Sequence, residues 1–156
     1  EFGQWNEWKE AGQLDWVLLE FPAHDSIRAL LRDLNRLYRS ETALHEFDFD
    51  PRGFRWIDCH DADQSVLSLV RQGQDASAQM VVLLNFTPVP RRGYRIGVPS
   101  GAAWYEVLNT DSMYYGGSNL GNGQPLHPQN LPWMGFDHSV EVTLPPLGAI
   151  FLKPCS

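Results

Sequence analysis

The stretch Gln79-Met80-Val81-Val82-Leu83-Leu84-Asn85-Phe86 decides the fold, because it holds five consecutive apolar residues between two breaks in the chain. A polar, turn-forming segment at residues 73–77 precedes it, and Pro88 follows it. A run this short and this apolar is typical of a strand buried on both faces; Pro88 and Pro90 limit the length available to the alternative, a buried helix segment. A second apolar run, at residues 66–71, lies just upstream across the turn. The pair predicts a β-hairpin at the centre of an all-β domain.

Residues 26–40 carry the clearest helical pattern of the sequence. Their apolar side chains recur at spacings of three and four, and they are Ile27, Leu30, Leu31, Leu34, Leu37 and Tyr38. This spacing predicts an amphipathic helix with one apolar stripe and an arginine-rich opposite face. Asp25 or Ser26 is the expected N-cap, because either side chain can accept a hydrogen bond from the first N–H groups. The stripe must bury against something, so we expect it to pack on the β domain or on a second copy of the chain.

Further short apolar or alternating runs predict strands at residues 55–58, 94–98, 104–108, 139–144 and 149–152. Residues 59–64 are rich in aspartate and are expected to form a turn. Residues 109–138 lack a sustained apolar period and hold several glycines and prolines, which predicts a long loop that is functional or docked on a neighbour. Short strands separated by turns predict an antiparallel two-sheet β-sandwich.

The helical period gives way to the strand period near residues 45–47. We therefore expect residues 1–45 to belong to a different unit from an all-β domain at residues 46–156. Residues 1–23 are aromatic and polar, with glycine and proline breakers, and predict a loop with a short turn of helix near residues 14–19.

The composition is that of one ordinary globular domain, with 156 residues, 43% hydrophobic residues and 20% charged residues. The net charge of −7 and the lack of a lysine- or arginine-rich face argue against a nucleic-acid partner. No run approaches a membrane span and no signal-peptide pattern appears, so we expect a cytoplasmic protein without a membrane partner. Cys59 and Cys155 could form one disulfide, but two free thiols are the preferred expectation. The sequence begins at Glu1 instead of Met, which indicates a fragment or a processed product.

Two groups of acidic residues are candidate sites, and both have simpler interpretations. Potential metal ligands are densest at Asp58, His60, Asp61 and Asp63. Their spacing matches neither a calcium loop nor a zinc motif, so a hairpin turn is preferred and no metal or cofactor is expected. Asp48 and Asp50 lie two residues apart on an expected strand, where they would point the same way instead of facing each other across a cleft. We therefore expect no catalytic residue in this chain.

Aromatic residues in the segments with weak secondary-structure signals are the better candidates for binding. They are Trp5, Trp8, Tyr114, Tyr115 and Trp133. Aromatic faces on loops can carry the apolar faces of sugar rings, with neighbouring amides and carboxylates binding the hydroxyls. We treat them as candidate glucan contacts. The alternative is that they pack between elements or cover a neighbouring domain.

A series of motifs resembles the C-terminal part of bacterial glycogen branching enzymes, which belong to the α-amylase family. In chain order they are Glu1-Phe2-Gly3-Gln4-Trp5-Asn6-Glu7-Trp8, Leu14-Asp15-Trp16, Arg32-Asp33-Leu34-Asn35, Tyr38, Ala43-Leu44-His45, Phe49-Asp50, Gly53-Phe54, Trp56-Ile57-Asp58, Asn85-Phe86-Thr87-Pro88-Val89, Tyr94-Arg95-Ile96-Gly97-Val98-Pro99, Asn109-Thr110-Asp111 and Tyr115-Gly116-Gly117-Ser118-Asn119. Each motif is modest by itself, but their order is specific and covers essentially the whole chain.

The resemblance implies a parent enzyme that cleaves an α-1,4-glucan and transfers it to a 6-hydroxyl, through a covalent intermediate on an aspartate with a glutamate as acid/base. The family's catalytic motifs lie upstream on a (β/α)8 barrel, so the resemblance assigns no catalytic residue to this chain. It implies that residues 26–40 are the last barrel helix and that residues 1–23 lie at the barrel rim. The expected partners are the rest of the parent enzyme and, as a ligand, an α-glucan such as glycogen.

Two alternatives stay open at this point. The chain could be a carbohydrate-binding β-sandwich module in its own right. It could also be the C-terminal part of another α-amylase-family enzyme, such as a trehalose-forming relative.

Overall fold

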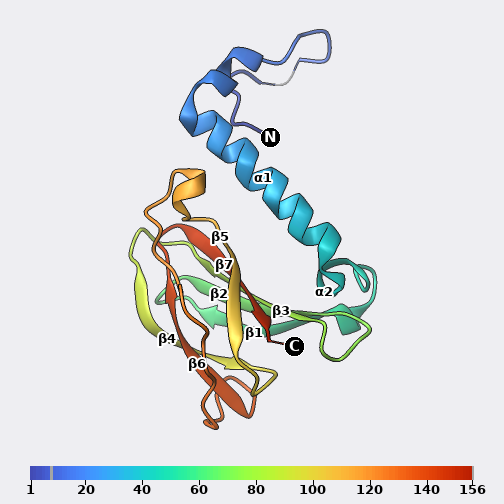
Figure 1. Cartoon of the computed structure of the whole chain (residues 1–156), viewed down its shortest axis with the longest axis vertical. Helices are drawn as coiled ribbons and strands as arrows, with labels where there is room; N and C mark the ends of the chain where they lie inside the picture. Colours follow the sequence, from blue (N-terminus) through green and yellow to red (C-terminus); the bar gives the residue numbers. More distant parts are fainter. Residues whose placement is uncertain (8, 156) are drawn as a thin grey trace.

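A computed structural model describes residues 1–7 and 9–155, and it consists of a β-sandwich with one long helix standing beside it (Figure 1). The helical elements are η1 (Trp16–Glu20), α1 (Pro22–Ser40), α2 (Thr42–His45), η2 (Pro51–Gly53) and η3 (Met113–Tyr115). The strands are β1 (Phe54–Asp61), β2 (Val66–Gln72), β3 (Gln79–Asn85), β4 (Arg91–Val98), β5 (Trp104–Asn109), β6 (His138–Leu144) and β7 (Gly148–Pro154).

The strands form two antiparallel sheets. One sheet has five strands in the order β1-β2-β3-β7-β5, and the other pairs β4 with β6. The predicted hairpin is confirmed, since β2 and β3 pair without a break from Val66 opposite Asn85 to Gln72 opposite Gln79. The predicted antiparallel two-sheet sandwich is confirmed as well.

Strand β3 is buried on both faces because it takes part in two separate apolar clusters. Val81 and Leu83 point into the main core between the sheets. Met80 and Val82 point the other way, into a second cluster with Ala43 of α2, which also includes the half-buried Leu37 and Leu44. Alternate side chains of a strand face opposite sides, so a continuous apolar run is what a strand between two cores requires.

Helix α1 begins earlier than the sequence pattern predicts. It starts at Pro22 and Phe21 is its N-cap, so the assignment of the cap to Asp25 or Ser26 is wrong. The reason is that proline is favourable in the first turn, where its missing N–H costs no hydrogen bond and its fixed φ suits the helix. Asp25 instead lies in the first helical turn, where a carboxylate complements the positive end of the helix dipole.

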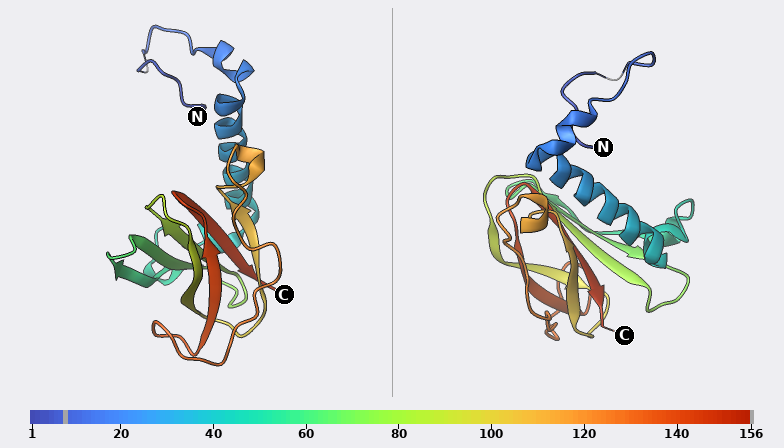
Figure 2. Two further views of the ribbon diagram at one scale, coloured as in Figure 1. Left: turned by 90° about the vertical axis from the view of Figure 1, so that its left-hand side faces the viewer. Right: turned by 45° about the horizontal axis from the view of Figure 1, so that its top comes forward.

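Helix α1 packs on the sandwich through the C-terminal part of its apolar stripe and lies against η3 farther back along the helix. Leu37 reaches the second cluster, whereas Leu30, Leu31 and Leu34 are half-buried and Ile27 is exposed. Figure 2 shows η3 lying alongside α1 while the N-terminal part of the helix projects beyond the sheets.

The N-terminal segment packs on the projecting end of α1. Phe2 is buried and stacks on Trp16 with ring centroids 5.7 Å apart. The backbone oxygen of Phe2 lies 2.8 Å from Nδ1 of the buried His24. The short helical turn expected in this region is present as η1.

The expected turn at residues 59–64 is only partly correct, because β1 continues to Asp61 and the chain turns after it. The register of β1 against β2 shifts twice, between Trp56 and Asp58 and again between Asp58 and Asp61. Such bulges bend an edge strand and let polar residues continue it. Cys59 on this strand carries a free thiol.

None of the described helices is long and apolar enough to cross a membrane.

Candidate functional site

The candidate aromatic residues lie in three separate parts of the structure. Trp5 is 79% exposed and meets the ring of His24 edge-on, with centroids 5.5 Å apart, beside the projecting end of α1. Tyr114 and Tyr115 belong to η3. Trp133 lies in the loop before β6, and Trp8 lies outside the described residues. The structure therefore brings no single platform together from the described members of this set.

Tyr115 fastens η3 to α1. Its hydroxyl donates to Oδ2 of Asp33 over 3.1 Å. A hydrogen bond from Arg32 lowers the pKa of Asp33, and the bond from Tyr115 lowers it further. Burial and the neighbouring carboxylate raise the pKa of Tyr115, which keeps its hydroxyl protonated as a donor. Tyr114 beside it is 81% exposed and, with Tyr115, borders a shallow cavity of about 300 Å³.

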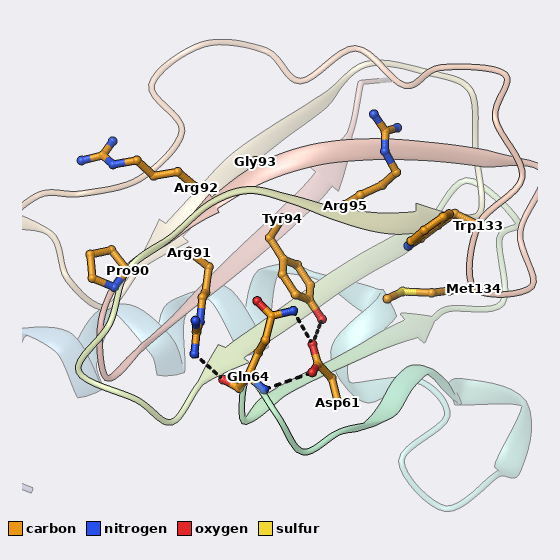
Figure 3. A pocket seen from close by; sticks show the side chains of 10 residues that line it. All are labelled: Asp61, Gln64, Pro90, Arg91, Arg92, Gly93, Tyr94, Arg95, Trp133 and Met134. Atoms are coloured by element: carbon orange, nitrogen blue, oxygen red, sulfur yellow. Dashed lines mark hydrogen bonds between the residues drawn. The ribbon is translucent and has the colours of Figure 1, made fainter.

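A larger cavity of about 550 Å³ lies along β4 and contains Trp133 (Figure 3). We call it the Trp133 cavity. Its lining residues are Asp61, Gln64, Pro90, Arg91, Arg92, Gly93, Tyr94, Arg95, Trp133 and Met134. Figure 3 places Trp133 and Met134 at one end and Pro90 and Arg92 at the other, with Asp61 and Gln64 between them.

Asp61 is the centre of a hydrogen-bond network in this cavity. Its Oδ2 accepts from the Tyr94 hydroxyl over 2.7 Å and from Nε2 of Gln64 over 3.1 Å, while its Oδ1 accepts from the Gln64 backbone N–H over 3.1 Å. Burial raises the pKa of Tyr94, and Asp61 raises it further, so the tyrosine stays a donor. Gln64, in the turn after β1, and Tyr94, on β4 of the other sheet, therefore hold the carboxylate in one orientation.

A tight two-residue turn carries Trp133. The backbones of Trp133 and Phe136 exchange both hydrogen bonds, at 2.9 and 3.0 Å, around Met134 and Gly135. Both central residues have positive φ, +49° for Met134 and +77° for Gly135, as a type I′ hairpin turn requires. Positive φ is rare for a residue with a side chain such as methionine, and such strain concentrates at functional sites.

Three contacts hold this strained turn in place. Arg55 donates to the Gly135 carbonyl over 3.1 Å, and its guanidinium lies 4.1 Å from the centre of the Phe136 ring. Gly97 of β4 lets the turn approach closely, since a Cβ there would lie 2.2 Å from the Trp133 carbonyl oxygen and 2.9 Å from the Phe136 ring. Trp133, 45% exposed, is therefore presented from a rigid support.

Sequence reasoning singled out Trp133 but not the residues around it. Gln64 was assigned to a turn, Tyr94 and Arg95 to a strand, and Asp61 to the same turn as Gln64 after a metal site had been considered there. A local signal did exist for the turn, because a residue followed by glycine between two aromatic residues fits a two-residue hairpin. No local signal marks the cavity, because its walls come from distant parts of the chain.

The acidic residues considered for catalysis or metal binding have structural contacts instead. Asp48 and Asp50 lie in turns before β1 and not on a strand, which corrects that expectation. Asp48 accepts from the hydroxyl of Tyr38 and from Nη2 of Arg71, the latter over 2.6 Å. Asp50 caps η2 and pairs with Arg52 over 2.7 Å. Among the described residues, no three or more histidine, cysteine or acidic side chains are grouped to hold a metal ion.

The contacts of Asp48 predict a pH-dependent stability. The hydrogen bonds from Tyr38 and then Arg71 lower its pKa in the folded state, so its contribution is complete above the ordinary aspartate pKa and disappears as pH falls through the lowered value. We expect Asp48→Asn to unfold at lower urea concentration near neutral pH, with the difference from wild type shrinking below about pH 4. Urea midpoints measured across this range test the prediction.

Asp63→Asn is the matched control, because Asp63 is exposed in the β1–β2 turn. This variant should keep the wild-type pH profile. Parallel profiles for Asp48→Asn and wild type would show that the Asp48 contacts add no pH-dependent stability.

The fold and the domain agree with a known family. Residues 56–155 match the family model described as the alpha amylase C-terminal all-beta domain, and the chain belongs to this family.

The relatives define the match more narrowly. The chain is 81% identical over 155 residues to the 1,4-alpha-glucan branching enzyme GlgB of Thiobacillus denitrificans, a match that covers 99% of this chain and 21% of that protein. It is 52% identical to the enzyme of the same name from Marinobacter nauticus, over 100% of this chain and 25% of that protein. A solved alpha-amylase structure from H. orenii superposes on 81% of the chain and 20% of its own length, with a TM-score of 0.47 and 15% identity.

The chain thus corresponds to the C-terminal part of glycogen branching enzymes, and this match confirms the resemblance found in the sequence. It spans about a fifth of the length of the T. denitrificans relative.

Proposed function

We propose that this chain is the C-terminal part of a cytoplasmic enzyme that forms α-1,6 branches in an α-1,4-glucan. The observation that carries the proposal is the 81% identity to a 1,4-alpha-glucan branching enzyme over 99% of the chain. Two further branching enzymes, at 52% and 51% identity, match nearly the whole chain as well. The chemistry is assigned to residues outside this chain, and the chain supplies structure.

The structural role is to cover the catalytic domain. Apolar side chains are exposed at the projecting end of the molecule, and they are Trp16, Val17, Phe21 and Ile27. An exposed apolar surface of this kind marks an interface. We assign residues 1–45 to the end of the catalytic barrel and residues 46–156 to the all-β domain, with this surface packing on the remainder of the barrel.

The acidic residues support an inactive chain. A retaining glycosidase-type site needs two carboxyl groups about 5–5.5 Å apart with differently tuned environments. Hydrogen bonds from Tyr38 and Arg71 lower the pKa of Asp48, and those from Arg52 lower the pKa of Asp50, so neither is suited to act as a general acid near neutral pH.

An exchange experiment tests this function. In the T. denitrificans enzyme, the 155 matching residues are replaced by this chain, and branching is followed by the loss of iodine staining of amylose and by branch content. The exchanged enzyme should branch amylose, and the enzyme truncated before these residues should not. The isolated chain should leave amylose unchanged.

Two results would contradict the proposal. One is branching activity in the isolated chain, which would place catalytic residues within it. The other is an exchanged enzyme that folds, as judged by circular dichroism and a cooperative unfolding transition, but does not branch amylose.

A further inference from the structure

We propose that the Trp133 cavity binds the non-reacting part of an α-glucan chain, with a glucose ring lying on the indole of Trp133 and its hydroxyls bonded by Asp61 and Gln64. The choice of ligand rests on the proposed function. The location rests on the cavity itself, which is separate from the exposed apolar surface assigned to the barrel interface.

The apolar half of the site is prepared before ligand binds. Trp133 is half-exposed, and its backbone is fixed by the paired turn, by Arg55 and by the close approach at Gly97. A rigid aromatic side chain loses little conformational freedom on binding, so more of the stacking energy appears as affinity. The flat face of an indole matches the C–H groups on one face of a glucose ring.

The polar half of the site offers both acceptors and donors. The Asp61 carboxylate takes three hydrogen bonds from Tyr94 and Gln64, and a carboxylate has about four lone-pair sites, so it can accept from one sugar hydroxyl. Gln64 donates one of its two side-chain N–H groups to Asp61, which leaves the second N–H as a donor and the side-chain carbonyl oxygen as an acceptor. Sugar hydroxyls both donate and accept, so this mixture of groups is the one they require.

The cavity is lined by charges of both signs, three arginines and one aspartate, and two of the arginines are bonded to other protein groups. Arg95 is paired with Glu141 over 2.6 Å, and Arg91 donates to the backbone carbonyl of Gln64 over 3.1 Å. Asp61 adds a negative charge at the centre of the cavity. The side chain of Arg92 points away from Tyr94 and Asp61 (Figure 3). Arg91 and Arg95 are thus held by neighbouring protein groups, and the cavity of about 550 Å³ is within the usual range for small-molecule sites.

Titration of the 156-residue chain with maltoheptaose, followed by nuclear magnetic resonance, tests the site directly. The indole N–H signal of Trp133 is assigned by its loss in Trp133→Phe. This signal, with the backbone signals of Gln64 and Gly93, should move in a saturable way. Trp133→Ala should raise the dissociation constant read from Gln64 and Gly93 about tenfold or more, as for removal of a central aromatic contact. Asp61→Asn should raise it by a smaller factor.

The controls separate this site from general effects. Tyr105→Ala removes an exposed aromatic ring from β5 and should leave the affinity unchanged. Trp133→Phe keeps an aromatic face and should bind better than Trp133→Ala. Inorganic phosphate in place of maltoheptaose should not shift the resonances of Trp133, Gln64 and Gly93.

Three results would overturn the inference. They are an unmoved Trp133 signal at saturating maltoheptaose, an unchanged dissociation constant in Trp133→Ala, and movement with phosphate but not with sugar. The exchange experiment separates this failure from failure of the proposed function. If the exchanged enzyme branches amylose while the Trp133 signal stays unmoved, only the proposed glucan site is contradicted. If the chain binds maltoheptaose saturably but the exchanged enzyme is inactive, only the proposed branching function is contradicted.

Discussion

Trp104→Ala is expected to lower the free energy of unfolding by about 3–5 kcal/mol, the range typical of large aromatic truncations in protein cores. Trp104 is 0% exposed and is the largest fully buried side chain among the described residues. It belongs to the main core between the sheets, and its indole N–H donates to the Ser100 carbonyl over 3.2 Å. Alanine would leave a cavity that the paired sheets cannot close and would also remove the partner of that carbonyl.

Urea denaturation followed by circular dichroism measures this effect, and the next residue provides the control. Tyr105 is 43% exposed on the same strand, so its ring points away from the core. Tyr105→Ala should change the free energy of unfolding by less than about 1 kcal/mol. A loss of unfolding free energy in Trp104→Ala as small as that expected for Tyr105→Ala would mean that the core does not depend on Trp104.

Asn85→Asp is the second substitution with a large expected effect, although it changes only one side-chain group. Asn85 is buried at the end of β3, and its Nδ2 donates to the carbonyls of Val89 and Pro145, each over 2.9 Å. Its Oδ1 accepts from the backbone N–H and the hydroxyl of Thr87. Aspartate keeps the acceptor but removes both donors and adds a buried charge. We expect a loss of about 3–5 kcal/mol near neutral pH.

The pH dependence of this variant identifies the cause. Burial without a cationic partner raises the pKa of a new carboxyl in the folded state, so the destabilisation is greatest above that pKa and decreases as pH falls through it. The difference between variant and wild type should therefore shrink on acidification. Asn35→Asp makes the same change at an exposed position of α1 and should have little effect at any pH. A pH-independent loss in Asn85→Asp would assign the effect to the missing donors alone.

The sequence predicted the sandwich well because its strands are periodic and local. Val81 and Leu83 alternate with Met80 and Val82, and this alternation is sufficient to place β3 between two apolar layers. The ends of elements were harder to predict. Helix α1 extends back to Pro22, where the apolar stripe gives no signal, and β1 extends through polar residues that a bulged edge strand tolerates.

The cavity could not be predicted in the same way. Asp61 ends β1, Gln64 lies in the turn that follows, Tyr94 comes from β4 and Trp133 from a loop before β6, and only the packing of the two sheets brings them together. Trp133 was chosen because it is an aromatic residue in a poorly patterned segment. Its support by Gly97 depends on a close backbone approach that composition and periodicity do not reveal.

The double use of β3 determines where the polypeptide can be shortened. A version starting at residue 46, the domain limit suggested by the change of periodicity, would lack Leu37, Ala43 and Leu44 and would leave Met80 and Val82 facing water. An apolar strand surface uncovered in this way invites association between molecules. We therefore expect a shortened chain to stay monomeric only if it retains the last turns of α1 together with α2, because these segments cover one face of β3.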